Sequence, residues 1–318
     1  MHKVFINEYG RLRSGWRAVI FVFGFIAALL VLVTVLRAFY AVFLTFTPLP
    51  RGRFIPDAIY RFSLLAAALA VGYLCARFLE GIPWRSLGMT LHDGWFRDLV
   101  IGCVIGFISL AIAVGIAAAG NGLKLSINDA PLVALGRSLL GSLTILFVAA
   151  LAEEAMFRGY PLQTFTRAQL VWFGIVLTSV LFGFAHLSNP NIVGLTFINT
   201  VLAGVWLAVG YVRTRSLWFP LGLHWAWNWA LGWFFGVPVS GATLFSNPLF
   251  RATDVGPEWL TGGNYGIEGG VAGTVAIVVS TVFLWWTPWL RATPDMEKLT
   301  SEENPAIPAS VISIRSVE

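Results

Sequence analysis

The chain has 318 residues, of which 57% are hydrophobic and only 12% are charged. Soluble globular domains carry about 45–50% apolar and about 25% charged residues, so this composition excludes an ordinary soluble domain. The net charge of +5 is small, and most basic residues stand in short loops between apolar runs. This distribution indicates membrane topology rather than nucleic-acid binding. The two cysteines, Cys75 and Cys103, lie in or beside apolar runs and predict neither a disulfide framework nor a zinc cluster.

Eight apolar runs are each long enough to cross a bilayer, which takes about 20 residues. They predict an all-α fold, a polytopic membrane helix bundle of about eight transmembrane helices that forms one domain over residues 1–293. Residues 238–270 are rich in Gly, Ser, Asn and Pro and predict an ordered outer loop, whereas residues 294–318 predict a flexible cytoplasmic tail. The runs cover roughly residues 18–36, 58–77, 99–119, 137–157, 169–187, 192–212, 217–237 and 271–290.

The basic residues predict a multi-pass protein of the cell membrane with both termini in the cytoplasm. With eight crossings, arginines fall in the cytoplasmic loops 78–98, 158–168 and 213–216, whereas the outer loop 238–270 is acidic. Arg51 and Arg53 are the exception, because they would lie outside.

The fourth run ends in two adjacent glutamates, and an ionisable residue inside a transmembrane helix indicates a functional site. Glu154 and Arg158 stand four residues apart on one helix face, so we expect an ion pair. Glu153 is rotated by about 100° from Glu154 and is expected to remain unpaired, as suits a general base or acid. The alternative is that both glutamates lie at the cytoplasmic end of the helix and are simply solvated.

Two histidines and an asparagine lie within later runs. His186 is near the end of the fifth run, and His224 and Asn228 stand four residues apart in the seventh, so that they share a helix face. The alternative for His186 is a satisfied buried histidine, and for the His–Asn pair it is interhelical hydrogen bonding. We prefer the hydrogen-bonding interpretation for Asn199 in the sixth run.

One acid, two imidazoles and one amide on three helices suit two kinds of peptide hydrolysis. A glutamate and a histidine can deprotonate a water molecule while the second histidine and the asparagine stabilise an oxyanion. Alternatively, Glu153, His186 and His224 can bind Zn²⁺ with an open position for water.

The three motifs resemble those of the CAAX-protease and bacteriocin-processing family (CPBP, or Abi). They are Glu153-Glu154-x-x-x-Arg158, Phe182-x-x-x-His186 and His224-x-x-x-Asn228, in this order along the chain. The resemblance covers about residues 95–235, and the Gly-rich stretch 259–270 is similar to an element of some bacterial members.

The resemblance implies an intramembrane endopeptidase whose catalytic residues are Glu153, His186, His224 and Asn228. Glu153 would activate water with His186 as its partner, His224 and Asn228 would stabilise the oxyanion, and Glu154 and Arg158 would have a supporting role. A metal-free mechanism is favoured because asparagine is a poor zinc ligand, with Zn²⁺ as the alternative cofactor. The expected substrate is a peptide or membrane-anchored protein at the lipid bilayer, and nucleic acid is not expected. Whether the substrate is prenylated does not follow from the sequence.

Two other functions remain open. A non-catalytic immunity or scaffold protein would bind a partner in the same cavity. A proton-coupled carrier would use Glu153 and His186 as a relay, but the expected inverted repeats are not evident.

The apolar runs place the motif residues at different depths. His186 is about 17 residues into the fifth run and His224 about 7 into the seventh, a mismatch of about 15 Å along helices that rise about 1.5 Å per residue. A shared site therefore predicts that the fourth helix continues to about residue 165, and that the segment around Pro220 begins deep in the bilayer.

Overall fold

The computed structural model of the chain describes residues 2–7, 10–47 and 54–300. It divides into two compact units: unit 1 comprises residues 1–90, 151–174 and 295–318, and unit 2 comprises residues 91–150 and 175–294. Arg51, Arg53 and the predicted tail beyond residue 300 lie outside the described residues.

Helices dominate the fold, which confirms an all-α polytopic membrane bundle, and each of the eight apolar runs contains one. In the described part of the chain, five helical segments are long and apolar enough to cross a membrane: 14–46, 55–80, 95–119, 132–167 and 196–214. The helices at 171–185 and 271–286 are apolar but shorter.

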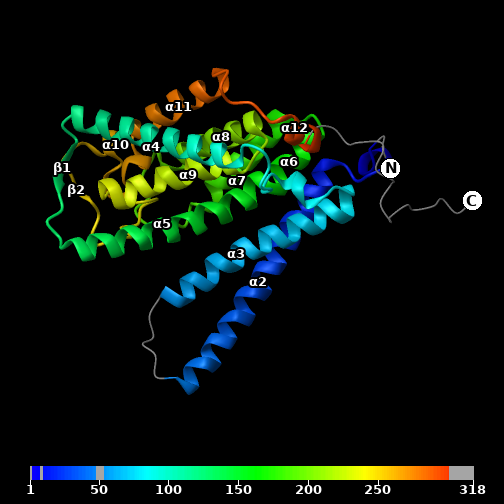
Figure 1. Cartoon of the computed structure of the whole chain (residues 1–318), viewed down its shortest axis with the longest axis horizontal. Helices are drawn as coiled ribbons and strands as arrows, with labels where there is room; N and C mark the ends of the chain where they lie inside the picture. The colour runs from blue at the N-terminus through cyan, green and yellow to red at the C-terminus, as the bar shows by residue number, and fades with distance from the viewer. Residues whose placement is uncertain (1, 8–9, 48–53, 301–318) are drawn as a thin grey trace, which may run out of the picture. The chain divides into compact units, whose positions relative to one another are not determined.

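Unit 1 is built on the helical hairpin of α2 (Ser14–Phe46) and α3 (Phe54–Cys75), which run side by side in Figure 1. Small residues of α3, Ala67 and Ala68, are buried in the hairpin core with Phe21 of α2, and Phe21 stacks on Tyr160 at 5.6 Å between ring centroids. Residues 1–90 of unit 1 also contain three short elements: α1 (His2–Phe5), the π-helical η1 (Ala76–Glu80) and the 3₁₀-helical η2 (Trp84–Leu87).

The helix of the fourth apolar run is longer than its hydropathy indicates. Helix α5 (Leu132–Glu154) continues through the π-helical η3 (Ala155–Gly159) into α6 (Tyr160–Arg167). This confirms the prediction that the helix extends to about residue 165. Pro161 is tolerated because it stands in the first turn of α6, where its missing N–H would have no helical partner.

A buried ion cluster holds α2, η1 and α6 together within unit 1. The Glu80 carboxylate accepts two hydrogen bonds of 2.8 Å from Arg167 and pairs with Arg17 at 3.0 Å. Arg167 also donates to Gln163 at 3.2 Å. All four side chains are almost completely buried. Helix α6, which carries Gln163 and Arg167, therefore lies in the interior of unit 1 although its sequence is not apolar.

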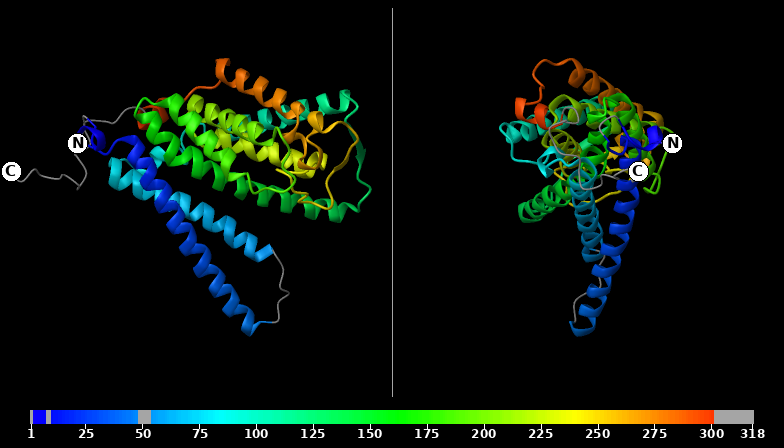
Figure 2. Two further views of the ribbon diagram at one scale, coloured as in Figure 1. Left: turned by 180° about the vertical axis from the view of Figure 1, so that it is seen from behind. Right: turned by 90° about the vertical axis from the view of Figure 1, so that its right-hand side faces the viewer.

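Unit 2 contains α4 (Trp95–Ala119), α8 (Thr196–Thr214) and α9 (Trp218–Trp229), whose axes are roughly aligned in Figures 1 and 2, with α8 antiparallel to the other two. It also contains most of α5, most of α7 (Val171–Ala185) and all of α11 (Val271–Trp286). Helix α9 ends in a π-helical segment, η4 (Ala230–Phe235).

Helices α4 and α9 approach each other backbone to backbone. A Cβ atom at Gly102 or Gly106 of α4 would overlap carbonyl oxygens of α9, and one at Gly222 of α9 would overlap the carbonyl oxygen of Leu99. Small residues let membrane helices come this close, so the position of α9 is fixed along α4.

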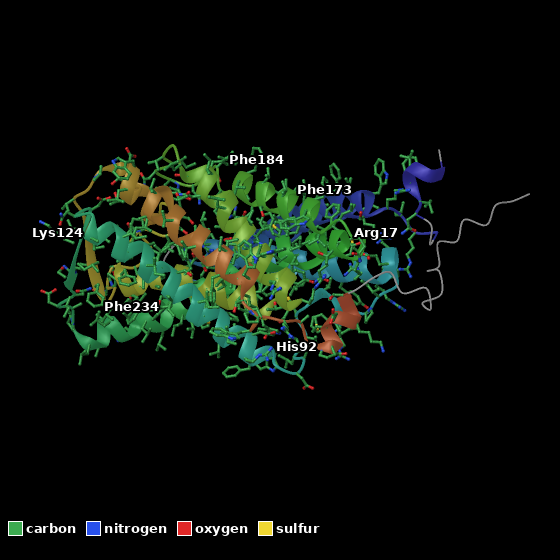
Figure 3. The ribbon with its side chains drawn as sticks, turned by 90° about the horizontal axis from the view of Figure 1, so that it is seen from above. Arg17, His92, Lys124, Phe173, Phe184 and Phe234 are labelled. Atoms are coloured by element: carbon green, nitrogen blue, oxygen red, sulfur yellow. The ribbon has the colours of Figure 1, made fainter. Side chains whose placement is uncertain are left out.

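One end of unit 2 carries a two-stranded antiparallel sheet, β1 (Leu123–Ile127) and β2 (Phe250–Asp254), in which Leu125 pairs with Ala252. Lys124 of β1 and His92 lie at opposite ends of α4 in Figure 3. The predicted outer loop is ordered: it contains β2, α10 (Glu258–Thr261) and two 3₁₀ turns, η5 (Gly263–Tyr265) and η6 (Ile267–Gly269).

The start of the predicted flexible tail is helical. Residues Pro294–Thr300 form α12, which begins with a proline and has acidic residues in its first turn, as helix N-termini favour. Met296 and Thr300 of this helix are buried. The hydropathy of the segment does not predict this burial.

Candidate active site

The Glu154–Arg158 pair is present as predicted. A guanidinium nitrogen of Arg158 donates to Glu154 at 3.1 Å, and both side chains are buried in unit 1. Their burial rules out the alternative in which Glu154 is simply solvated. Removing either partner would leave an uncompensated charge in a region of low dielectric, so the pair holds the end of α5 in one conformation.

Glu153 differs from its prediction in one respect. It is half-buried, but it also interacts electrostatically with Arg158, so the prediction of an unpaired carboxylate is wrong. The cause is η3, because a π-helical turn brings residues five apart onto one turn and Arg158 is five residues after Glu153. Arg158 therefore serves both glutamates, and π-helical segments of this kind are frequent at functional sites.

His186 stands one residue beyond the end of α7 and is half-buried in unit 2. Its Nδ1 lies 2.7 Å from the carbonyl oxygen of Phe182. Because a carbonyl oxygen only accepts, Nδ1 is the donor, and the neutral ring keeps its lone pair on Nε2. This tautomer suits a histidine that accepts a proton through Nε2.

His224 and Asn228 lie one turn apart on α9, with His224 buried and Asn228 half-buried. The ring of Phe182 contacts both histidines, at 4.4 Å between centroids for His186 and at 6.1 Å, edge to face, for His224. Unit 2 therefore brings the second and third motifs together, despite the depth mismatch that the apolar runs predict.

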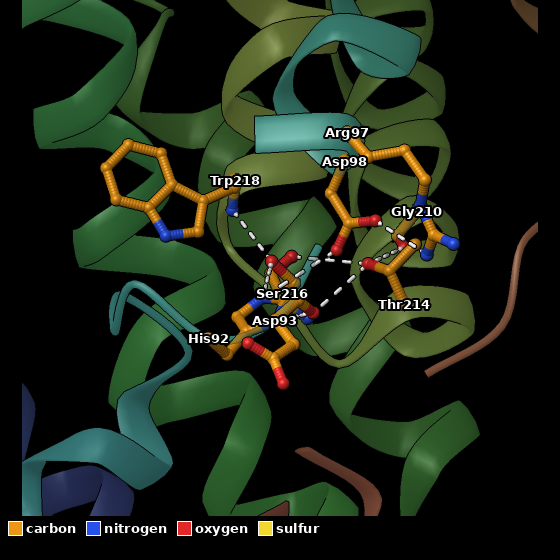
Figure 4. Close-up of polar contacts among 8 residues, drawn as sticks. All are labelled: His92, Asp93, Arg97, Asp98, Gly210, Thr214, Ser216 and Trp218. Carbon is orange, nitrogen blue, oxygen red and sulfur yellow. Dashed lines mark hydrogen bonds and ion pairs between the residues drawn. The ribbon is translucent and has the colours of Figure 1, made fainter. Parts of the chain in front are cut away.

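The beginning of α9 is anchored by a buried polar cluster, shown in Figure 4. The Ser216 hydroxyl lies 2.9 Å from Nε2 of His92 and accepts from the backbone N–H of Trp218 at 3.3 Å. Nδ1 of His92 lies 2.9 Å from the carbonyl oxygen of Asp93, and the carboxylate of Asp98 is 3.7 Å from Nε2. Because Ser216 is fully buried, we assign the cluster to fixing α9 and not to chemistry.

An apolar cavity of about 420 Å³ lies within unit 2 between α4, α5 and α9. Trp225, Ala226 and Trp229 of α9 form part of its wall, and Trp225 is held by a hydrogen bond to the carbonyl oxygen of Leu143 in α5. The remaining wall comes from Leu143 of α5 and from Cys103, Val104, Phe107 and Ile108 of α4.

Asn199 forms interhelical hydrogen bonds, as its position in an apolar run predicts. Its amide donates to the carbonyl oxygens of Glu268 and Gly270, and it accepts from the hydroxyl of Thr274 at 2.7 Å. These bonds join α8 to α11 and to the turn before it.

Sequence reasoning missed the anchoring residues of α9. The Gly102-x-x-x-Gly106 spacing is a signal for close helix packing that could have revealed the α4–α9 contact. His92 and Ser216 stand in loops, where their residue types carry no such signal. Within the described part of either unit, no three His, Cys, Asp or Glu side chains gather closely enough to hold a metal ion.

Comparison with known proteins supports the family resemblance. Residues 134–230, which include all three motifs, match the family model described as type II CAAX prenyl endopeptidase Rce1-like. An Escherichia coli protein described as an uncharacterized 24.3 kDa protein is 36% identical over 88 residues, which are 27% of this chain and 40% of that protein. The chain thus spans less than half of this relative.

The family match confirms the resemblance drawn from the motifs over residues 134–230. Several apolar helices agree with a multi-pass membrane protein. Unit 2 joins His186 and His224, whereas the relation of Glu153 to them stays a prediction.

Proposed function

We propose that the chain is an intramembrane endopeptidase that hydrolyses a peptide bond of a membrane-anchored substrate. The observation that carries this proposal is the placement of His186 and His224 on one Phe182 ring, because their apolar runs alone would separate them. Helix α5 adds support: its residues Leu143 and Phe147 contact Trp225 of α9, and the same helix ends in the two glutamates.

The proposed reaction assigns one step to each side chain. Glu153, with His186 as its partner, takes a proton from water, and the hydroxide attacks the carbonyl carbon of the scissile bond. His224 and Asn228 donate hydrogen bonds to the oxyanion of the tetrahedral intermediate. When the C–N bond breaks, the proton held by Glu153 passes to the leaving amine. The Glu154–Arg158 pair holds the helix end in place.

The apolar cavity favours a lipid-modified substrate. Its volume of about 420 Å³ is within the range of about 300–1,000 Å³ that small-molecule sites occupy, and residues of the Asn228 helix form its wall. A prenyl chain bound there would lie against α9, the helix that carries His224 and Asn228. The proposed topology, with both termini in the cytoplasm, rests on the arginines of the short loops.

We keep the metal-free mechanism because it gives Asn228 a role that a zinc site would not. If Zn²⁺ is used, Glu153, His186 and His224 are the proposed ligands. A chelator that abolishes cleavage, with recovery on adding zinc, would establish that alternative.

The test uses the full chain in phosphatidylcholine vesicles with a fluorescence-quenched, farnesylated CAAX peptide. We expect the wild type to cleave the peptide, and Glu153→Gln and His224→Ala to lower kcat by about 10³-fold or more, since each removes a group that acts on the reacting atoms. Glu258→Gln is the matched control, because Glu258 is exposed in the outer loop. Wild-type cleavage by both variants would overturn the proposal.

A second measurement separates a protease from a non-catalytic immunity or scaffold protein. Membrane proteins of cells that carry the wild type are compared, by their new N-termini, with those of cells that carry Glu153→Gln. A membrane protein that is cut only in cells with the wild type supports the protease. If the N-termini are the same in both cells and the farnesylated peptide stays uncut, the non-catalytic alternative is supported. If the same peptide without its farnesyl group is cleaved equally well, only the proposal of a prenylated substrate is rejected.

A further inference from the structure

Glu268 lies in the Gly-rich part of the outer loop, and its carboxylate joins two segments of unit 2. One oxygen, Oε1, accepts from the indole N–H of Trp227 at 3.0 Å. The other, Oε2, accepts from the backbone N–H of Ser240 at 2.7 Å and from its hydroxyl at 3.3 Å. Both carboxylate oxygens are therefore used, each by a different segment.

The first of these segments is the helix of the third motif. Trp227 stands between His224 and Asn228 on α9 and is almost fully buried. Its ring meets Trp206 of α8 edge to face at 5.4 Å. A hydrogen bond that fixes the indole therefore also fixes the turn of α9 that presents the proposed oxyanion pair.

The second segment leads to the loop that follows His186. Gly241, next to Ser240, accepts from the Asn191 side chain at 2.9 Å and donates to the carbonyl oxygen of Tyr265 at 3.0 Å. The Tyr265 side chain is buried, and its hydroxyl lies near the side chains of Asn189, Ser240 and Thr200. Burial, and secondly the Glu268 carboxylate, raise the pKa of the Tyr265 phenol, so that the hydroxyl keeps its proton.

The backbone of Glu268 is itself held in place. Asn199 donates to the carbonyl oxygens of Glu268 and Gly270 at 2.9 and 3.0 Å. The carboxylate thus projects from a fixed frame made by α8 and the start of α11, and its two oxygens set the distance between α9 and the Ser240 turn.

We propose that Glu268 is a positioning residue of the proposed site, which holds the His224–Asn228 turn of α9 in register with the loop after His186. This inference rests on the proposed function. Glu268 acts through Trp227 and through the Ser240 turn, and it makes no contact with the reacting atoms.

The test compares Glu268→Gln with Trp227→Phe on the farnesylated peptide in vesicles. Glutamine has one acceptor oxygen, so either Trp227 or Ser240 then faces an NH₂ group. We expect kcat to fall by about ten-fold with KM changed less than about two-fold, as for a group that aligns the transition state. Trp227→Phe removes the indole N–H and should give the same loss, and the double variant should be no worse than either single one. Glu258→Gln is the control in the same loop.

Hydrogen exchange supplies a readout that does not depend on activity. In Glu268→Gln, peptides that cover residues 186–195 and 238–242 should exchange faster than in the wild type, while the β1–β2 sheet stays unchanged. Wild-type kcat and exchange in Glu268→Gln, or losses that multiply in the double variant, would overturn the inference. Failure of the proposed function gives a different result, because the wild type would then leave the peptide uncut or Glu153→Gln would cleave it as the wild type does.

Discussion

At the scale of single residues, Arg158 is the group whose loss should matter most for stability. It is fully buried and interacts with both Glu153 and Glu154, so its positive charge offsets two carboxylates at the end of α5. Arginine suits this role because its guanidinium presents several donors in a fixed plane.

We predict that Arg158→Met destabilises the protein by about 3–5 kcal/mol, because it leaves a buried carboxylate without its partner. The measurement is the thermal unfolding of the purified protein in detergent. The double variant Glu154→Gln with Arg158→Met should recover part of the loss, since the more deeply buried charge is then removed. An unchanged unfolding temperature in Arg158→Met would show that the pair is dispensable.

The residue scale also shows where sequence reasoning failed. The spacing of Glu154 and Arg158 was enough to predict their ion pair, because four residues make about one helical turn. The interaction of Glu153 with Arg158 was missed, because it depends on the π-helical turn η3, for which the residue pattern gave no signal. Glu268 was missed for a different reason, because a glutamate in a polar loop is common and its sequence context gives no signal of a functional role.

At the scale of elements, the α4–α9 contact determines where His224 and Asn228 lie. The contact is made by glycines, and the carbonyl oxygen of Leu223, the residue before His224, lies against Gly106. A side chain at Gly106 would therefore push away the turn that carries the proposed oxyanion pair.

We predict that Gly106→Ala lowers both the unfolding temperature and kcat, with a destabilisation of about 1–3 kcal/mol from overpacking. Gly115→Ala in the same helix is the matched control, because nothing lies within 4 Å of its added Cβ. The control should be neutral or stabilising by about 0.5–1 kcal/mol, since alanine favours a helix over glycine. Equal behaviour of the two variants in thermal unfolding and peptide cleavage would refute the positioning role of this contact.

Hydropathy predicted the existence of the helices but not all of their ends. The segment Tyr160–Arg167 is polar in sequence and fully buried in structure, because Arg167 and Gln163 satisfy each other and Glu80 inside unit 1. A window that scores apolar residues stops before such a segment. The extension to about residue 165 was predicted only because the motifs needed a common depth.

At the scale of the whole molecule, the composition and the eight runs were enough to predict a polytopic helix bundle, because the bilayer demands long helices with satisfied backbones. The two-stranded sheet β1–β2 was not predicted, since its strands are short and lie in segments that look like ordinary loops. The candidate residues were predicted from motifs on separate helices, and unit 2 brings two of those motifs to one aromatic ring.

The central claim is that Glu153 shares one site with His186, His224 and Asn228, and a short bismaleimide cross-linker tests it directly. In a protein with Cys75→Ala and Cys103→Ala, we expect Glu153→Cys with His224→Cys to give an intramolecular cross-link, identified by mass spectrometry. The positive control is His186→Cys with His224→Cys, since both rings contact Phe182. A cross-linked control with no cross-link between positions 153 and 224 would contradict the account.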